Sequence, residues 1–393
     1  MTGERVYETI VIGGGPAGAT AARRLALAGR HTLLIDAARF PRPKACGGGL
    51  TGNVQRFLDF PIDSVVENAV TETLCMFRGR RTILLKPVGL NVAMVRRDLF
   101  DHLLVKKALE AGANLKDGTR VRRLERKNDR WRVETTKGAY ESQTVIGADG
   151  AAGRTGEAAG LRREKRLGIA LDCEVSVPRE RFERFKRRAI FDFGIVPRGY
   201  GWSFPKGDRF SIGVGTTEKH FPEAREHLRL LIARHESLRG AKVLDTRGAP
   251  LPFWKGFEPL ARQGVFLVGD AAGLVDPLSG EGISYAIRSG ILAARFVDEK
   301  ISGGANAEGG YTETVEKEIS RGFAFALRLA EIFFTHPRLC YFIGVRSISV
   351  NNVFARLISG EIDYAQLYEE LAASFPGRVY RALKPVLKRW KAA

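Results

Sequence analysis

The chain has 393 residues, and its 63 lysines and arginines against 44 aspartates and glutamates give a net charge of +19. This length allows two or three domains with a sizeable core, and this charge favours polyanions such as nucleic acid, anionic lipid headgroups or diphosphates, unless it only serves solubility. The four cysteines form no C-x-x-C pair, which argues against a zinc site, an iron–sulfur cluster and a disulfide scaffold. The sequence has no apolar run of ~18 residues, which argues against a membrane span. It also has no recognisable nucleic-acid-binding motif, which argues against nucleic acid as the partner.

The chain opens on a nucleotide-binding pattern. Residues 6–12 read as a buried strand, and Gly-Gly-Gly-Pro-Ala-Gly at 13–18 fits the G-x-G-x-x-G fingerprint. A helix is predicted at 17–27, followed by a strand at 31–35 that ends at Asp36. The first glycine makes a tight turn, the second lets the backbone approach a pyrophosphate, the third lets helix and strand pack closely, and the acid binds ribose hydroxyls. A glycine-rich turn without a ligand is the alternative.

A cysteine followed by three glycines, at 46–49, lies ten residues beyond Asp36. This position places a thiol and a bare backbone close to the nucleotide that the first unit would bind. The proximity indicates redox chemistry on a flavin, with the thiol facing the reactive ring. The alternative is that Cys46 is a small buried hydrophobe, which is the commoner role of a free cysteine.

The next part of the chain combines short strands, a helix and an antiparallel sheet. Strand-like pieces are predicted at 82–85 and 91–95, and a helix at 97–111, which a glycine ends. Residues 119–146 read as a β-meander, and Gly-Ala-Asp-Gly at 147–150 as a sharp turn.

A β-rich stretch follows at 168–255, interrupted by charged helix-like segments near 179–188 and 221–238. Within it the aromatic residues of Tyr-Gly-Trp-Ser-Phe at 200–204 alternate, so on a strand all three face one side. They are expected either to form an aromatic wall against a ligand or to pack in the core of a sheet.

The strand predicted at 265–268 ends close to an acid, Asp270, and a glycine-rich loop then leads into a helix that is expected to begin near Gly280. The N-terminus of that helix offers free backbone N–H groups and partial positive charge. Such a helix end would stabilise negative charge on a reduced flavin.

The last ninety or so residues are predicted to be mainly helical. Val379, Leu383, Val386 and Trp390 recur at helical spacing among basic residues, with a kink expected at Pro385. This segment would lie on an anionic bilayer or pack on the domain with a solvated basic face.

Several motifs together resemble known flavoproteins. The fingerprint at 13–18, Gly-Ala-Asp-Gly at 147–150 and Gly-Asp-Ala-Ala-Gly at 269–273 occur in this order in FAD enzymes similar to para-hydroxybenzoate hydroxylase. Phe-Pro-Arg-Pro-Lys-Ala-Cys-Gly-Gly-Gly-Leu-Thr at 40–51 and Tyr-Gly-Trp-Ser-Phe-Pro at 200–205 resemble the geranylgeranyl reductase family more narrowly. The resemblance implies an FAD enzyme that saturates isoprenoid double bonds in lipids, chlorophyll side chains or quinone tails.

The implied fold class is α/β (α+β overall), with a Rossmann-like FAD-binding domain, an inserted β-rich substrate domain and a helical C-terminal region. The expected boundaries are 1–75, 96–165 and 256–300 for the discontinuous FAD-binding domain, 76–95 and 166–255 for the substrate domain, and 301–393 for the helical region.

The resemblance also suggests site residues in three groups, and no metal ligands. The catalytic group is Cys46, Gly47 and Gly48. The cofactor-binding group is Gly13, Gly15, Ala17, Gly18, Asp36, Ala45, Cys46, Gly47, Arg97, Val121, Asp270, Gly280, Gly282 and Ile283, and the substrate-binding group is Tyr200, Trp202, Phe204 and Pro205. The guanidinium of Arg97 suits the FAD pyrophosphate, and a solvated arginine at a helix start is its alternative.

The implied reaction transfers a hydride from N5 of reduced FAD to one alkene carbon and a proton from Cys46 or an ordered water to the other. Close geometry and exclusion of water must assist, because an unactivated alkene resists hydride attack. A single dinucleotide fingerprint leaves transiently docked NADPH or a ferredoxin-like carrier protein as the electron donor. The expected partners are an isoprenoid lipid or diphosphate and an anionic membrane surface. The first strand begins too early for a signal peptide, so the expected location is the cytoplasm or the inner face of the membrane.

Two other functions stay open at this point. One is an FAD-dependent monooxygenase or halogenase of an aromatic or polyketide substrate, although a halogenase would favour Trp-x-Trp-x-Ile-Pro where this chain has Tyr-x-Trp-x-Phe-Pro. The other is a non-redox protein that binds isoprenoid lipids, resembling Rab GDP dissociation inhibitors. The intact Asp36, Arg97 and Asp270 argue against that second alternative.

Overall fold

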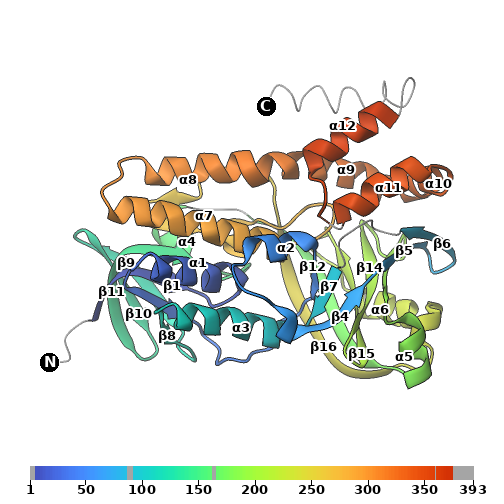
Figure 1. Ribbon diagram of the computed structural model, residues 1–393, viewed down its shortest axis with the longest axis horizontal. Coiled ribbons are helices and arrows are strands. Elements are labelled where there is room, and N and C mark those ends of the chain that lie inside the picture. The colour runs from blue at the N-terminus through green and yellow to red at the C-terminus, as the bar shows by residue number, and fades with distance from the viewer. Residues whose placement is uncertain (1–4, 86–91, 162–164, 359, 375–393) are drawn as a thin grey trace.

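The computed structural model describes residues 5–85, 92–161, 165–358 and 360–374. Two sheets lie beside each other, and long helices from the C-terminal part of the chain lie across one side of both (Figure 1).

The first sheet has eight strands and contains the N-terminal unit. Its strands are β1 (Arg5–Ile12), β2 (Thr32–Ile35), β8 (Asn114–Lys116), β9 (Val121–Lys127), β10 (Arg130–Thr135), β11 (Gly138–Gly147), β17 (Ala261–Arg262) and β18 (Val265–Leu267). They run in the order β17-β18-β11-β1-β2-β8, and β10 and β9 continue antiparallel from β11. Strand β1 runs parallel to both of its neighbours, and helices α1 (Pro16–Leu27) and α3 (Arg97–Glu110) pack against each other beside it.

The N-terminal unit confirms the predicted strand, turn, helix and strand. The helix expected at 17–27 begins one residue earlier, at Pro16, whose fixed φ suits the first helical position. Gly29 follows the helix with a φ of +78°, a left-handed conformation that glycine adopts without strain. Ile10 and Val11 of β1 are fully buried, as expected of a parallel strand covered on both faces.

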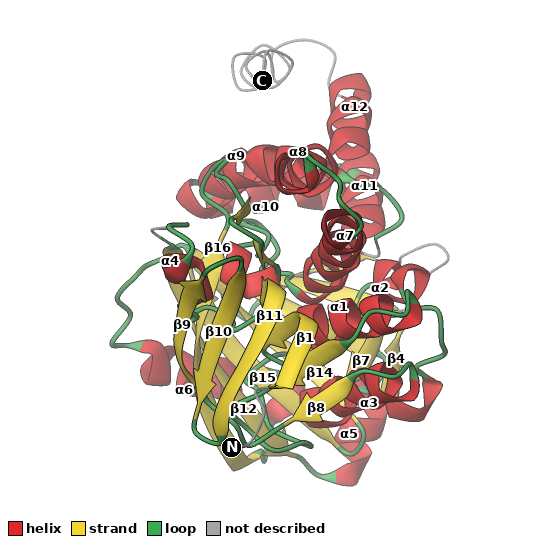
Figure 2. Cartoon of the chain, turned by 90° about the vertical axis from the view of Figure 1, so that its left-hand side faces the viewer, coloured by secondary structure: helices red, strands yellow, loops and turns green. Residues whose placement is uncertain are grey.

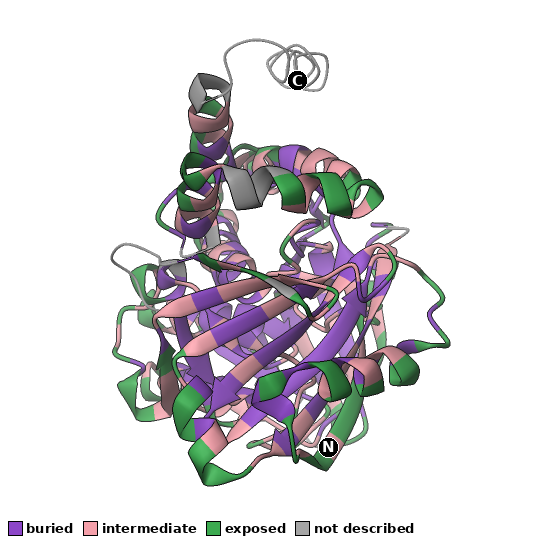
Figure 3. Cartoon of the chain, turned by 90° about the vertical axis from the view of Figure 1, so that its right-hand side faces the viewer, coloured by how far each residue is buried: buried purple, intermediate pink, exposed green. Residues whose placement is uncertain are grey.

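The second sheet has seven strands and carries the aromatic motif. Its strands are β5 (Glu72–Phe77), β6 (Arg81–Leu85), β12 (Arg166–Ser176), β13 (Arg188–Phe193), β14 (Gly199–Lys206), β15 (Arg209–Thr216) and β16 (Lys242–Phe253), in the order β16-β12-β15-β14-β13-β5-β6. Helices α5 (Arg179–Phe185) and α6 (Ala224–Arg234) and the short η2 (Glu236–Leu238) confirm the two predicted charged helical segments. They build a separate core in which Phe210, Ile212 and Val214 meet Phe182 and Leu231. Figure 3 shows buried residues along these strands and exposed outer faces on the helices.

A small sheet of three strands links the two larger ones. It contains β3 (Gly49–Leu50), β4 (Val66–Val70) and β7 (Val92–Val95), and α2 (Gly52–Phe57) and η1 (Asp63–Val65) lie between β3 and β4. The predicted strand pieces at 82–85 and 91–95 are thus β6 and β7, although Asn91 lies outside the described residues. The backbone N–H of Val95 donates a hydrogen bond to the carbonyl of Gly48 (2.9 Å), which anchors the cysteine loop at this sheet.

Helices dominate the last third of the described chain and lie above the strands (Figure 2). They are α7 (Ile283–Ile301), α8 (Ala307–Val315), the π-helical segment η4 (Glu316–Ser320), α9 (Arg321–Thr335), α10 (Pro337–Arg346), α11 (Ile348–Ile358) and α12 (Tyr364–Ser374). The short α4 (Thr155–Ala158) and η3 (Gly269–Ala272) lie earlier in the chain. The helix expected to begin near Gly280 begins at Ile283, because Gly280 has a left-handed φ of +72° that no α-helix contains.

This architecture confirms the predicted fold class, which is α/β with a β-rich second sheet and a helical C-terminal region. The residue boundaries of the domains stay predictions. The amphipathic segment with Val379, Leu383, Val386 and Trp390 lies outside the described residues, so its membrane role also stays a prediction.

Candidate active site

A cavity of about 1420 Å³ is lined by residues of both large sheets and of the C-terminal helices. The sequence-predicted residues in its wall are Gly13, Gly15, Ala17, Asp36, Ala45, Cys46, Gly47, Gly48, Arg97, Val121, Tyr200, Trp202, Phe204, Asp270, Gly280, Gly282 and Ile283. Gly18 and Pro205 are not part of the wall. Pro205 follows Phe204 on a strand and therefore faces the opposite side of the sheet. The structure thus brings the predicted cofactor and substrate residues to one cavity, while their roles stay predictions.

The glycines of the first turn permit close backbone approach. Gly13 has a φ of +107°, and a Cβ there would lie only 2.2 Å from the carbonyl oxygen of Ala148. A Cβ at Gly18 would lie 1.9 Å from the carbonyl oxygen of Gly13, so this glycine serves the packing of α1 on β1. At Gly15, by contrast, a Cβ would meet nothing closer than Arg42 at 3.7 Å. The start of α1 is therefore bare backbone that faces the cavity.

Asp36 is held in place by the backbone at the end of β2. Its carboxylate accepts hydrogen bonds from the N–H groups of Gly14 and Ala38, both at 2.8 Å. Arg42, which sequence reasoning did not single out, lies 3.5 Å from Asp36 and 3.3 Å from Asp101, and it also lines the cavity. Its only sequence signal is its place in the segment that leads to the cysteine loop.

This end of the cavity fits a dinucleotide. The first N–H groups of an α-helix have no partners inside the helix, and here they open onto the cavity next to a carboxylate suited to a ribose. Asp149 adds an acceptor: one carboxylate oxygen caps the start of α4 through Arg154 and Thr155, and the other is buried without a hydrogen-bond partner among the described residues. The size of the cavity and these groups suit FAD.

The sulfur of Cys46 accepts a hydrogen bond from the backbone N–H of Gly48, which lies 3.3 Å away. The guanidinium of Arg97 lies close to the same sulfur. Arg97 is buried and also binds Asp101 with two hydrogen bonds of 2.8 and 2.9 Å. Although burial opposes its charge, Asp101 and Cys46 raise the pKa of Arg97, which keeps the guanidinium cationic. The alternative of a solvated arginine is therefore wrong, and contact with the FAD pyrophosphate stays a prediction.

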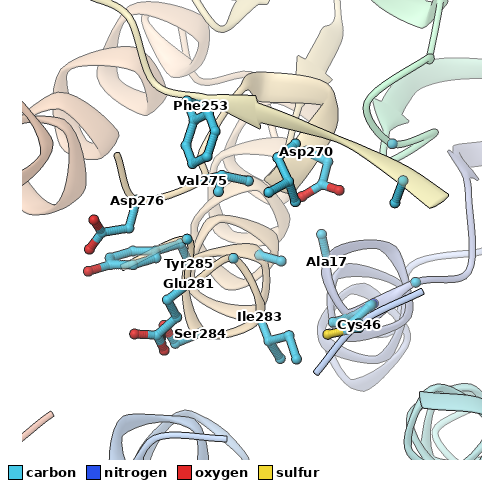
Figure 4. Close-up of a pocket in the computed structure, with 18 of the residues that line it drawn as sticks. Ala17, Cys46, Phe253, Asp270, Val275, Asp276, Glu281, Ile283, Ser284 and Tyr285 are labelled. Carbon is cyan, nitrogen blue, oxygen red and sulfur yellow. Dashed lines mark hydrogen bonds between the residues drawn. The ribbon is translucent and has the colours of Figure 1, made fainter. Parts of the chain in front are cut away.

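A loop between η3 and α7 forms the opposite wall (Figure 4). Asp270 lies near Gly282, where a Cβ would be 3.6 Å from a carboxylate oxygen of Asp270. Gly282 caps the 19-residue helix α7, whose free N–H groups therefore begin at the cavity.

The same loop carries two carboxyl groups that sequence reasoning missed, the buried Asp276 and the half-buried Glu281. Asp276 accepts hydrogen bonds from the hydroxyl of Tyr364 (2.6 Å) and from the backbone of the loop. Glu281 accepts bonds from the hydroxyls of Thr51 (2.8 Å) and Ser284 (2.6 Å). Burial raises the pKa of both carboxyl groups, against the effect of these hydrogen bonds. Their acidic residue types gave no signal of burial in the sequence.

The aromatic residues of β14 form the wall that faces the cysteine loop. Tyr200, Trp202 and Phe204 line the cavity from one side of the strand, as predicted. The ring of Phe204 lies against Gly47, where a Cβ would be 2.8 Å from ring atoms. The indole nitrogen of Trp202 is buried without a hydrogen-bond partner among the described residues, and the hydroxyl of Tyr200 donates a hydrogen bond to the carbonyl of Ser279.

Residues that sequence reasoning left unassigned extend this wall. Phe191 contacts Tyr200 and Phe204 with ring centroids 5.5 and 5.2 Å apart. Phe193 meets Phe333 of α9 at 4.8 Å, and both line the cavity. The cavity therefore continues from the cysteine loop into an apolar region between the second sheet and the C-terminal helices.

In the described part of the chain, no cluster of three or more histidine, cysteine, aspartate or glutamate side chains has the arrangement of a metal site. None of the helices in the described ranges has the length and hydropathy needed to span a bilayer.

Comparisons with known proteins agree with this geometry. Residues 6–183 match the family described as FAD binding domain. The chain is 32% identical over 315 residues to geranylgeranyl diphosphate reductase of Rhodobacter capsulatus, covering 77% of this chain and 78% of that protein. It is 30% identical over 379 residues to menaquinone reductase of Mycolicibacterium smegmatis, covering 89% of this chain and 91% of that protein.

A solved structure is similar over nearly the whole length. A geranylgeranyl bacteriochlorophyll reductase-like protein from Thermoplasma acidophilum superposes with a TM-score of 0.79 at 25% identity, covering 98% of this chain and 100% of that chain. The first sheet, the second sheet and the helical region thus recur together in that structure.

Proposed function

This chain belongs to the geranylgeranyl reductase family of FAD-dependent oxidoreductases, and on that premise we propose that it saturates carbon–carbon double bonds of an isoprenoid chain. One observation carries the proposal: the aromatic wall of β14 and the Cys46 loop face each other in the same cavity that receives the bare start of α1. A nucleotide at one end and an apolar chain at the other would meet at Cys46, Gly47 and Gly48.

The residues proposed to hold FAD come from three parts of the chain. The turn at Gly13 and Gly15 with the start of α1 would bind the pyrophosphate, Asp36 the ribose, and Asp270 with the start of α7 the flavin end. When bound and reduced, FAD supplies the hydride that one alkene carbon receives. NADPH or a ferredoxin-like carrier is the proposed source of electrons.

Cys46 is proposed to supply the proton that the other alkene carbon receives. The S–H bond breaks as the new C–H bond forms, and a thiolate remains. The N–H of Gly48 donates a hydrogen bond to this sulfur and the cationic guanidinium of Arg97 lies close to it, so both would stabilise the negative charge left on it. The water-poor aromatic wall holds the alkene near the sulfur, where orientation reduces the barrier.

The proposed substrate has an anionic head group. The two named relatives are a reductase of geranylgeranyl diphosphate, which has an anionic head group, and a reductase of menaquinone, which has none. In this chain Arg198, Lys317 and Arg321 line the cavity in addition to its apolar region. These cations support geranylgeranyl diphosphate or a geranylgeranyl phospholipid. An anionic membrane surface is the proposed place where the enzyme collects a lipid of this kind.

The test is an anaerobic reduction of the FAD-loaded protein with dithionite, followed by addition of geranylgeranyl diphosphate. We expect the flavin absorbance to recover without oxygen and the product to gain two hydrogen atoms for each double bond, measured by mass spectrometry. The fully saturated diphosphate is the control and should leave the flavin reduced. Recovery only on admission of oxygen would refute the proposal and support a monooxygenase. If the uncharged geranylgeraniol reoxidises the flavin as fast as geranylgeranyl diphosphate does, only the proposed preference for an anionic head group is refuted.

A further inference from the structure

Lys206 is a buried cation that the proposed reaction does not use. It ends β14 on the same side as Tyr200, Trp202 and Phe204, and its side chain is 2% exposed. Unlike those three residues, it is not part of the cavity wall. Burying an ammonium group is costly unless it is paired, so its partners indicate its role.

The ammonium group of Lys206 contacts the cysteine loop directly. It lies 3.2 Å from a carboxylate oxygen of Glu174 and donates a hydrogen bond of 3.3 Å to the carbonyl of Cys46. Its side chain also packs on Gly48, where a Cβ would lie 3.0 Å from Cε and 3.1 Å from Nζ of Lys206. One buried lysine therefore touches both residues that flank Gly47.

A carboxyl group of the same sheet lies near the backbone of this residue. Asp172 accepts a hydrogen bond from the hydroxyl of Ser211 (2.8 Å). Burial raises the pKa of Asp172, and the neighbouring backbone of Cys46 acts in the opposite direction. Asp172 and Glu174 point to the same side of β12, which is separated from β14 by β15 alone. The carbonyl of Cys46 is thus bound by a buried lysine of the second sheet, and Asp172 of the same sheet lies near the backbone of this residue.

We propose that Lys206, supported by Glu174 and Asp172, is a positioning residue that fixes the backbone of Cys46 and thereby the direction of its sulfur. A segment with three consecutive glycines has a large conformational freedom in the absence of such bonds. The ion pair transmits the rigidity of the second sheet to a loop that the first sheet and the small sheet hold only at its ends. The function assigned to the sulfur rests on the proposed reductase activity, whereas the fixation of the loop does not.

The first experiment measures the loop without any substrate. The FAD-loaded protein is treated with iodoacetamide, and the alkylation rate of each of its four cysteines is followed by peptide mass spectrometry. In Lys206→Met we expect Cys46 to react several times faster than in the wild type, while Cys173 and Cys340 keep their rates. Lys206→Arg should return Cys46 towards the wild-type rate, because it restores the charge. Lys255→Met is the matched control, since that lysine also pairs with a glutamate (3.4 Å) but lies outside the cavity wall.

The second experiment measures turnover of the isoprenoid substrate. For Lys206→Met we expect kcat to fall about 10- to 100-fold with KM nearly unchanged, because the aromatic wall stays intact. If that variant does not fold, Glu174→Gln keeps the lysine and should give a smaller change of the same sign in both experiments.

The outcomes separate this proposal from the proposed function. Equal alkylation of Cys46 in the wild type and in Lys206→Met, or in Glu174→Gln, would overturn the positioning role. A raised alkylation rate in a protein that reduces no isoprenoid would support the positioning role and refute the reductase activity. A parallel rise at Cys173 and Cys340 would show general loosening of the fold and would also overturn the specific role of Lys206.

Discussion

The two ends of the cavity are built by opposite means. At the nucleotide end the working groups are backbone N–H groups, exposed by Gly13 and Gly15 at the start of α1. At the aromatic end they are side chains from β13 and β14 and from α9, which lies more than a hundred residues further along the chain. A backbone site depends on local spacing and tolerates no added atom, whereas a side-chain site depends on long-range packing and tolerates exchange. Mutations at the two ends should therefore fail in different ways.

The largest effect is expected at the nucleotide end. Gly18→Val places a Cβ 1.9 Å from the carbonyl oxygen of Gly13, so α1 has to move away from β1. We expect loss of bound FAD and a destabilisation of about 1–3 kcal/mol or more, measured by the flavin-to-protein absorbance ratio and by urea unfolding. Gly256→Ala is the control, since no atom lies within 4 Å of its Cβ position. Full FAD binding in Gly18→Val would break the proposed contrast.

The next largest effect is expected where the two ends meet. Cys46→Ser removes the proposed proton donor but keeps the shape of the loop. We expect kcat to fall about 100-fold or more with the FAD content unchanged, measured by anaerobic flavin reoxidation with the substrate. Cys340→Ser, on α10 and outside the cavity wall, serves as the control. Full turnover by Cys46→Ser would assign the proton to water and reduce Cys46 to a packing role.

A smaller effect is expected at the aromatic end. Trp202→Leu removes ring area from the wall, yet its neighbours Phe191 and Phe204 remain. We expect KM to rise about tenfold, equivalent to about 1.4 kcal/mol of binding, with FAD retained. Steady-state kinetics with chains of different lengths measure this, and Phe182→Leu in the separate core of the second sheet is the control. A change in FAD content instead of KM would mean that the indole N–H binds the cofactor.

The smallest effect concerns pH. Burial raises the pKa of Glu281 above the unfolded value near 4.3. The folded state then binds more protons than the unfolded state, so this group lowers stability as the pH rises from about 4 through its folded pKa. In Glu281→Gln, which keeps the acceptor for Thr51, the melting temperature should fall less over this range. Glu180→Gln, at an exposed residue of α5, is the control, and an identical profile in the wild type and in Glu281→Gln would contradict the assignment.

The contrast between local patterns and long-range packing also explains which features could be predicted from the sequence. The turn at Gly13, the strand–helix unit and the alternation of Tyr200, Trp202 and Phe204 are local patterns, and each appears in the structure where it was expected. The buried position of Lys206 could not be predicted, because a lysine after a proline is typical of the end of a strand. Its partner Glu174 lies 32 residues away in the sequence. Asp276 was not singled out from the sequence either, since its partner Tyr364 is 88 residues further along the chain.

The start of α7 is another detail that the sequence did not predict. Composition indicated a helix after the glycine-rich loop, but the left-handed turn at Gly280 delays it to Ile283. The side-chain hydroxyl of Tyr200 lies 3.0 Å from the Cβ position of Gly280, so the aromatic strand leaves little room for a side chain at this turn. Contacts between distant strands and loops therefore decide details that periodicity leaves open.

The hydrogen bond from the hydroxyl of Tyr200 to the carbonyl of Ser279 joins the aromatic strand to the loop that precedes α7. Any molecule that shifts Tyr200 also shifts this loop, and by thermodynamic reciprocity any change of charge at the loop alters the affinity at Tyr200. In the proposed enzyme, oxidised and reduced cofactor should then bind the isoprenoid with unequal strength.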